Sequence, residues 1–261
     1  MCIRDSNNII PRLEPHIDSS AFVISCTKGI QPDPFRTMTE IISKHLGHVI
    51  GDKVGALSGP NLAKEIADQK IAGTVIASSN KTLSYEIKTI LSSNTFKVFS
   101  SADTQGVELA GALKNIYAIC CGIAHAKNVG ENALGFMVTR SMAEMSRFAV
   151  AKGANPITFL GLAGMGDLMA TCTSKLSRNF QLGELLGADM SLKEAKAKVG
   201  QVAEGARTLE VVFLEAKKMD VSMPMVDSLY KILYEDSSSD ELIQDLLDHP
   251  NEVDVEFTYK D

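Results

Sequence analysis

The hydrophobic period of this chain changes near residue 101, and this change constrains the fold more than any other feature of the sequence. Before residue 101, short β-branched apolar runs alternate with amphipathic stretches, a pattern typical of βαβ units and a mostly parallel sheet. After it, nearly every stretch follows helical spacing. We therefore predict an incomplete α/β domain over residues 1–100 and an all-α domain over residues 101–261.

The expected elements follow from apolar periodicity and from turn residues. Strands are expected at 21–27, 54–59, 71–77 and 96–99, and helices at 34–46, from Pro60 to Ala67, and at 81–91. Further helices are expected at 107–126, 132–152, 156–160, 177–186, 191–199, 206–218 and 225–233. The acidic stretch 236–261 is expected to form a short solvated helix and a tail.

Composition narrows the class of partner. The chain has 261 residues, 45% of them hydrophobic, and a formal net charge of −6, which fits a globular protein and disfavours nucleic acid. A small anionic substrate stays open, because a local basic pocket needs few side chains. The five cysteines are odd in number and form no C-x-x-C, so we expect no zinc site, no disulfide framework and a cytoplasmic location. No secretory signal or membrane insertion is expected.

The glycine fingerprint of dinucleotide-binding domains, G-x-G-x-x-G after a strand, does not occur in the sequence. The glycine cluster at 161–166 lies in the helical part and follows no strand, so a loop between helices is favoured over a phosphate-binding loop. Residues 1–6 differ in style from the rest of the chain. The first domain is therefore either small and unusual, or part of a fragment.

Lys114 is the first candidate for chemistry, since it is a lone lysine in a stretch rich in Ala, Gly and Leu. One interpretation is a lysine that snorkels out of an apolar face. The other is a buried lysine with a depressed pKa that donates or accepts a proton, with Gly111 allowing close approach and Asn115 orienting it.

Lys28 and the segment 58–61 each end a predicted strand. Ligands of open α/β sheets bind outside the carboxyl ends of strands, which makes Lys28 a candidate, although a surface lysine is the alternative. The segment Ser-Gly-Pro-Asn leads into a helix whose free N–H groups could hold an anion, and a plain helix start is the alternative.

The segment from Gly166 to Asn179 could form a phosphate cradle. Ser177 is a plausible N-cap, with Arg178 and Asn179 in the first helical turn, and Asp167 could pair with Lys114 or accept substrate hydroxyls. A capped helix without a ligand is the alternative. The loop at 200–207 carries Glu204, which could accept hydrogen bonds from ribose or amide groups.

Together these segments resemble the bacterial-type NAD(P)-dependent glycerol-3-phosphate dehydrogenases, in the order of that family and over most of the chain after about residue 20. The matching pieces are C-T-K-G at 26–29, L-S-G-P-N-L-A-K-E at 57–65, G-V-E-L-A-G-A-L-K-N at 106–115, A-G-M-G-D-L at 163–168, S-R-N at 177–179 and G-Q-V-A-E-G at 200–205. Residues 1–6 lie outside the resemblance.

The resemblance implies a role for each matching residue. Lys114 would be the proton acceptor, or the donor in the reducing direction, and Lys28 would contact both substrate and cofactor. Asn61 stands where the family often has Thr, and an amide can hydrogen-bond there too. The implied substrate-binding residues are Lys28, Gly59, Asn61, Lys114, Asp167, Ser177, Arg178 and Asn179, and the implied cofactor-binding residues are Lys28, Ala63, Arg178, Val202 and Glu204.

The resemblance further implies a Rossmann-like first domain, NAD or NADP as cofactor, and reduction of dihydroxyacetone phosphate to sn-glycerol 3-phosphate for glycerophospholipid synthesis. It places the missing fingerprint on an N-terminal segment that this chain lacks, which would leave a sheet edge unpaired. Two alternatives stay open: another two-domain dehydrogenase acting on a hydroxy acid, and a non-catalytic fragment that only binds substrate or forms a homodimer.

Overall fold

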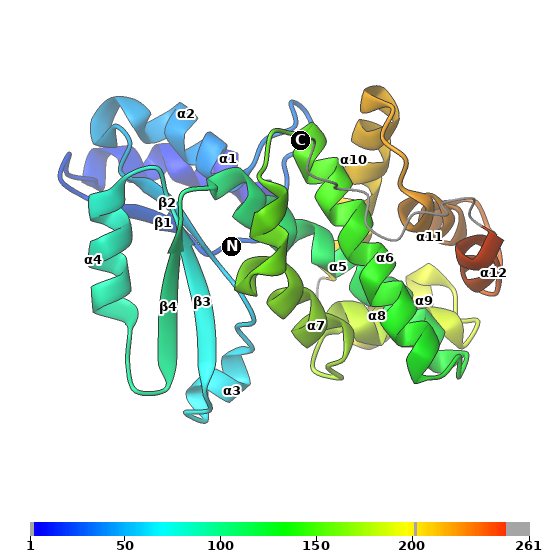
Figure 1. Ribbon diagram of the computed structural model, residues 1–261. Coiled ribbons are helices and arrows are strands. Elements are labelled where there is room, and N and C mark those ends of the chain that lie inside the picture. Colours follow the sequence, from blue (N-terminus) through cyan, green and yellow to red (C-terminus); the bar gives the residue numbers. More distant parts are fainter. Residues whose placement is uncertain (1–2, 201–202, 249–261) are drawn as a thin grey trace, which may run out of the picture. The chain divides into compact units, whose positions relative to one another are not determined.

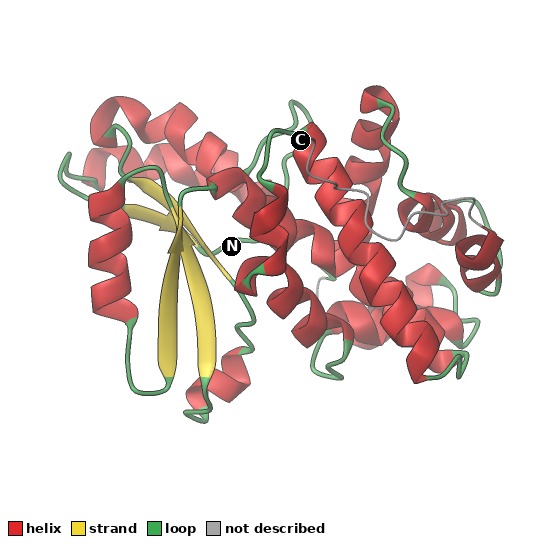
Figure 2. Ribbon diagram, viewed as in Figure 1, coloured by secondary structure: helices red, strands yellow, loops and turns green. Residues whose placement is uncertain are grey.

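Four short strands form one sheet in the first part of the chain, and the other described elements are helices (Figures 1 and 2). The structure is a computed structural model that describes residues 3–200 and 203–248. Packing divides the chain into unit 1, Met1–Ala112 with Gly153–Asp167, and unit 2, Leu113–Lys152 with Leu168–Asp261. The predicted domain boundary near residue 101 stays a prediction.

The four strands lie where the sequence predicts them: β1 (Val23–Ser25), β2 (Val54–Ser58), β3 (Ala72–Ala77) and β4 (Phe96–Ser101), in that order across the sheet. The β1–β2 and β3–β4 pairs are parallel, as expected of a Rossmann-like sheet. The β2–β3 pair is antiparallel, so the sheet is mostly parallel, as predicted, but β2 and β3 do not form a βαβ unit. Its connection contains only α3 (Ala63–Ala67), which buries none of its residues and therefore makes no crossover on the sheet.

Two helices of unit 1 begin a few residues after the proline at which they were predicted to begin. α2 (Met38–Ile50) begins four residues after Pro34, because Thr37 and Glu40 form a capping box. Likewise α3 begins at Ala63, not at Pro60 as predicted. α4 (Lys81–Leu91) has the predicted bounds, and its N-cap Asn80 accepts a hydrogen bond from the Leu83 amide.

The helix α1 (Ile3–Leu13), followed by a 3₁₀ turn η1 (Glu14–His16), was not predicted. Ile10 of α1 is 2% exposed and packs in one core cluster with residues of α2 such as Leu46. The buried Ser6 hydroxyl contacts the sulfur of Met38. Residue 6 is therefore part of the packed fold, which corrects its separation from the rest of the chain on sequence style.

Alternate residues of β3 pack into two different layers of unit 1. Ile76 clusters with Leu83 of α4 and with Val98 of β4. Val75 and Ala77 cluster on the other side with Val107 of α5 (Thr104–Ala126). The sheet is thus covered on both faces, which is usual for parallel strands.

The glycine cluster at 161–166 is helical, not the loop expected from the sequence. A 3₁₀ helix η2 (Pro156–Leu160) is followed by a π-helical turn η3 (Leu162–Gly166), which leads into α7 (Asp167–Cys172). A Cβ at Gly164 would lie 2.2 Å from the carbonyl oxygen of Phe159. The glycine therefore permits the close packing of η3 on η2.

Unit 2 is helical, and its helices lie within a few residues of their predicted positions, except α7, which was not predicted. α12 confirms the predicted short helix but is not wholly solvated, because Leu242 is 1% exposed; the tail 249–261 lies outside the described residues. Beyond α5 the helices are α6 (Glu131–Ala151), α8 (Arg178–Gly187), α9 (Leu192–Val199), α10 (Glu204–Met219), α11 (Pro224–Tyr234) and α12 (Glu241–Asp248).

The long helix α5 forms the centre of the helical core. Among the described residues it is the one helix long and apolar enough to span a membrane, and its apolar window is entirely buried in the protein. A long apolar helix that is buried inside the protein is typical of a core helix. Close packing explains its small residues: a Cβ at Gly122 would lie 2.2 Å from the carbonyl oxygen of Phe180 on α8.

Candidate active site

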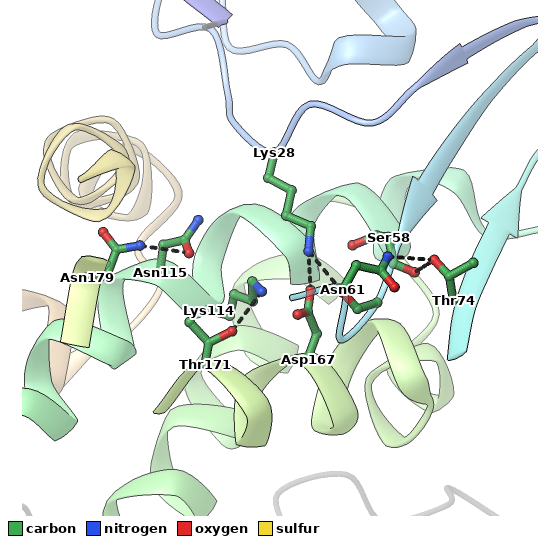
Figure 3. Close-up of polar contacts among 10 residues, drawn as sticks. Lys28, Ser58, Asn61, Thr74, Lys114, Asn115, Asp167, Thr171 and Asn179 are labelled. Atoms are coloured by element: carbon green, nitrogen blue, oxygen red, sulfur yellow. Dashed lines mark hydrogen bonds and ion pairs between the residues drawn. The ribbon is translucent and has the colours of Figure 1, made fainter. Parts of the chain in front are cut away.

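Lys28 follows β1 and makes an ion pair inside unit 1. Its Nζ lies 2.6 Å from Oδ2 of Asp167, at the start of α7, and 3.1 Å from the carbonyl oxygen of Gly59 (Figure 3). The Asp167 side chain is 1% exposed and that of Lys28 is 24% exposed. The carboxylate therefore holds the ammonium at the carboxyl ends of β1 and β2, the edge at which α/β sheets bind ligands.

Gly59 follows β2 in a conformation that requires glycine. Its φ is +153°, and a Cβ there would lie 3.0 Å from Cα of Thr74. This conformation lets its carbonyl group accept the hydrogen bond from Lys28.

Asn61 is anchored through β3. Its Nδ2 donates to Oγ1 of Thr74 at 2.9 Å, and that hydroxyl donates to the Ser58 carbonyl oxygen at 3.1 Å (Figure 3). Two nearby buried atoms, Oδ1 of Asn61 and Oγ of Ser58, have no hydrogen-bond partner among the described residues. Buried polar atoms are normally paired, so these two are groups that a bound ligand could satisfy.

Gly111 brings α5 close to this group of residues. A Cβ at Gly111 would lie 2.6 Å from Oγ of Ser58 and 3.4 Å from Cγ of Lys28. The close approach that the sequence suggested at Gly111 is therefore made to Lys28, which follows β1, and to Ser58, the last residue of β2.

Lys114, one helical turn after Gly111 on α5, is buried in the protein. It is 7% exposed, and its Nζ donates to Oγ1 of Thr171, itself 6% exposed, at 2.7 Å (Figure 3). The interpretation of Lys114 as a snorkelling surface lysine is therefore wrong. Thr171 follows Asp167 by four residues on α7, which places both on one face of that helix.

The start of α8 is capped as predicted, since Oγ of Ser177 accepts the amide of Phe180 at 3.3 Å. Arg178 is the first residue of α8. Asn179 donates to Oδ1 of Asn115 and accepts the Gly205 amide, both at 2.9 Å, so its amide group ties α8 to α5 and α10. The predicted contact of Asn179 with substrate stays a prediction.

Of the other residues predicted to bind the cofactor, Ala63 is the first residue of α3 and Glu204 is the first residue of α10. Val202 lies outside the described residues. A pairing of Asp167 with Lys114 stays a prediction.

Thr74 could not be found from the sequence, and the contact made by Thr171 could not be either. Thr74 reaches Asn61 only because β2 and β3 pair in antiparallel register, which no local pattern indicates. Thr171 belongs to the candidate segment 166–179, but its hydrogen bond to Lys114 depends on tertiary packing, which the sequence does not indicate.

The fold and these residues define a class: a Rossmann-like α/β unit with helical packing around a buried lysine, a layout that suits nicotinamide-dependent chemistry. Family models give a narrower result. The model described as NAD-dependent glycerol-3-phosphate dehydrogenase N-terminus matches residues 4–84, and the C-terminus model of the same enzyme matches residues 103–244. The chain belongs to the NAD-dependent glycerol-3-phosphate dehydrogenase family. Its match begins well before residue 20, where the sequence-based resemblance began.

Individual relatives agree with the family models. Glycerol-3-phosphate dehydrogenase (NAD(P)+) from Alcanivorax borkumensis is 49% identical over 249 residues, which are 95% of this chain and 72% of that protein. The crystal structure of glycerol-3-phosphate dehydrogenase from Coxiella burnetii superposes with a TM-score of 0.87 at 34% identity, over 94% of this chain and 74% of that one. The enzyme from Saccharomyces cerevisiae matches with a TM-score of 0.84 at 25% identity, over 94% and 73%.

A more distant likeness concerns the fold alone. D-mandelate dehydrogenase, which was solved with NADH, matches with a TM-score of 0.53 at 13% identity. This similarity therefore gives no support to the hydroxy-acid alternative.

Proposed function

We propose that this chain reduces dihydroxyacetone phosphate to sn-glycerol 3-phosphate, reversibly, with NADH or NADPH as the hydride donor. Family membership supports the reaction, and the buried Lys114 held by Thr171 is the observation that carries the mechanism. We further propose that the product supplies glycerophospholipid synthesis in the cytoplasm, where the free cysteines would stay reduced. A homodimer stays a prediction.

Lys114 is the proposed general acid. Reduction at C2 of the substrate places negative charge on the ketone oxygen, and an ammonium group can donate a proton to it. The Thr171 hydroxyl is neutral, so it directs Nζ without neutralising its charge. Burial of Lys114 keeps water from competing for the same proton.

Arg178 and the start of α8 are the proposed phosphate site. A guanidinium group can hold two phosphate oxygens at once, and the first amides of a helix favour an anion. Asn179 fixes this helix start against α5 and α10 through Asn115 and Gly205. The amide group would thereby hold Arg178 and Ser177 in place for the phosphate.

The rest of the substrate is proposed to contact Lys28, Gly59, Asn61 and Asp167. Lys28 is also proposed to contact the cofactor. The unsatisfied atoms Ser58 Oγ and Asn61 Oδ1 suit the amide and hydroxyl groups of a nicotinamide nucleotide, so the residues present fit this end of the cofactor. Further proposed cofactor contacts are Ala63, Arg178, Val202 and Glu204. When bound, the cofactor supplies the hydride.

The proposal is tested by measuring NADPH and NADH oxidation by this chain with dihydroxyacetone phosphate, with unphosphorylated dihydroxyacetone and with a 2-keto acid. The expected result is turnover that depends on the phosphate group. Equal rates with the unphosphorylated ketone, or preference for the keto acid, would favour the hydroxy-acid alternative. Binding of the phosphate substrate without any turnover would contradict the proposed catalysis.

A further inference from the structure

A second polar pocket lies in unit 1, where the parallel strands β3 and β4 end. It has a volume of about 280 Å³ and is bounded by one face of α4, by Ser78 after β3 and by Ser101 at the end of β4. The Ser78 amide donates to the Ser101 carbonyl oxygen at 3.1 Å, which joins the two strand ends. None of the residues assigned to the candidate active site lines this pocket.

Sheet topology separates this pocket from Lys28 and Ser58. Because β2 and β3 are antiparallel, the carboxyl ends of β3 and β4 lie at the sheet edge opposite to the carboxyl ends of β1 and β2. The Ser78 hydroxyl shows the same arrangement, since it donates to the carbonyl oxygen of Val54, the first residue of β2. The pocket is therefore a separate location on the same sheet.

The helix face that lines the pocket is cationic. One face of α4, which lies beside β4 in Figure 1, lines the pocket. It carries, at the i, i+3, i+4, i+7 spacing of a helical face, Lys81, Ser84, Tyr85 and Lys88. No carboxylate is among the described residues that line the pocket. Neither lysine forms an ion pair within the described part of the chain, although the whole protein carries a net charge of −6.

Ser84 is a largely buried residue that contributes a hydroxyl to the same pocket. The residue is 8% exposed and lines the pocket. Its amide donates to Asn80, but no hydrogen bond of its hydroxyl occurs within the described residues. The neighbouring hydroxyl of Ser78 is already used, by Val54 and by the Asn80 amide. Ser84 therefore offers the pocket a hydroxyl that no described residue engages, on the helix face that carries both lysines.

We propose that this pocket binds the phosphate group of a small anion. Apart from Ser78, whose hydroxyl proton is donated to Val54, the polar side chains that line it can donate hydrogen bonds, which suits a ligand whose oxygens only accept. Lys81 and Lys88 would supply the charge, and Ser84 and Tyr85 the directed donors. Free phosphate and a phosphorylated metabolite share this chemistry.

A single tryptophan can report binding at this pocket. The chain contains no Trp, and Tyr85 is 68% exposed, so Tyr85→Trp introduces a single tryptophan fluorophore at the pocket. The indole N–H replaces the tyrosine O–H as a hydrogen-bond donor. Inorganic phosphate is titrated at constant ionic strength, with chloride as the reference. We expect a saturable change in fluorescence, weakened roughly tenfold or more by adding Lys81→Gln and Lys88→Gln.

The matched control is Lys97→Gln, which removes an exposed lysine of β4 outside the pocket and should leave the titration unchanged. A parallel titration with sn-glycerol 3-phosphate identifies the source, since a tighter response than to inorganic phosphate indicates a phosphorylated metabolite. An equal response indicates recognition of the phosphate group alone. No saturable response to either ligand, or the same response in the double lysine variant, would overturn the proposal. The readout needs no turnover, so either result leaves the proposed reaction untouched.

Discussion

Nζ of Lys114 and Oγ1 of Thr171 lie 2.7 Å apart, with both residues more than nine-tenths buried. The Thr171 hydroxyl, which is a neutral group, thus helps to fix the direction of the lysine inside the protein. A hydroxyl at this place orients a charged donor and leaves its proton available for transfer. The catalytic role proposed for Lys114 depends on this pair.

Thr171→Val should lower kcat by roughly 10–100-fold, because the buried ammonium loses its orienting partner. KM for dihydroxyacetone phosphate should change little, since the proposed phosphate contacts lie on α8. Thr171→Ser keeps the hydroxyl and should retain most of the activity. Steady-state kinetics of the three proteins test this. A rise in KM with unchanged kcat would show that Thr171 acts in binding.

Lys28→Met should destabilise the protein by roughly 2–3 kcal/mol, because it leaves the Asp167 carboxylate buried beside an apolar side chain. The control is Lys70→Met, which removes an exposed ion pair with Glu65 at 3.6 Å and should cost less than about 0.5 kcal/mol. Urea unfolding of both variants gives the comparison. Equal losses would mean that the Lys28–Asp167 pair contributes no more than a surface contact.

Much of the architecture was predictable because it depends on local patterns. The strands β1–β4 and the helix α4 follow from apolar runs and from a capping asparagine, and the start of α8 from Ser177. The antiparallel β2–β3 pair was not predictable, because it depends on α3 failing to cover the sheet. The helix α1 was missed because its apolar face is completed by α2, which lies far along the chain.

The site shows the same division. The strand ends drew attention to Lys28, Gly59 and Asn61 because of position alone. Thr74, by contrast, lies inside a strand and reaches Asn61 through a pairing that the sequence does not encode locally. For Lys114, periodicity allowed both exposure and burial, and only the packing of the helical unit decides between them.

Loss of the proton from the buried Glu144 carboxyl group should make the protein less stable as pH rises. Its carboxylate accepts the amide of Met225 at 2.7 Å and the Tyr117 hydroxyl at 3.2 Å, and Arg147 and Cys120 are the other ionisable groups facing it. Burial raises the pKa of Glu144 from 4.5 to about 7, against the opposing effect of these hydrogen bonds and of Arg147. The folded state therefore binds the proton more tightly than the unfolded state.

The stabilising effect of that proton is complete below about pH 4.5 and is lost as pH rises through about 7, a change of about 3 kcal/mol. Glu144→Gln should remove this part of the slope between pH 5 and 8. Burial also raises the pKa of Glu108, so a residual slope of the same sign should remain. Urea unfolding of both proteins across this pH range measures the difference. Parallel pH profiles would contradict the role of Glu144.

Gly183→Ala should destabilise the protein by more than about 3 kcal/mol. The added Cβ would lie 2.0 Å from the carbonyl oxygen of Ile119, so α5 and α8 would have to move apart. Gly135→Ala is the matched control, since nothing lies within 4 Å of its Cβ in α6. It should stabilise the protein by about 0.5–1 kcal/mol. Thermal unfolding of both variants tests the pair, and a tolerated Gly183→Ala would contradict the close packing of α5 on α8.

The proton transfer assigned to Lys114 is tested most directly by comparing turnover and ligand binding in Lys114→Ala, with Lys193→Ala on the exposed face of α9 as control. We predict that Lys114→Ala lowers dihydroxyacetone-phosphate-dependent NADPH oxidation by roughly 10²–10⁴-fold. Its midpoint of thermal unfolding should still rise with sn-glycerol 3-phosphate, because the proposed phosphate contacts remain. Near-normal turnover by Lys114→Ala would contradict the assignment of the acid.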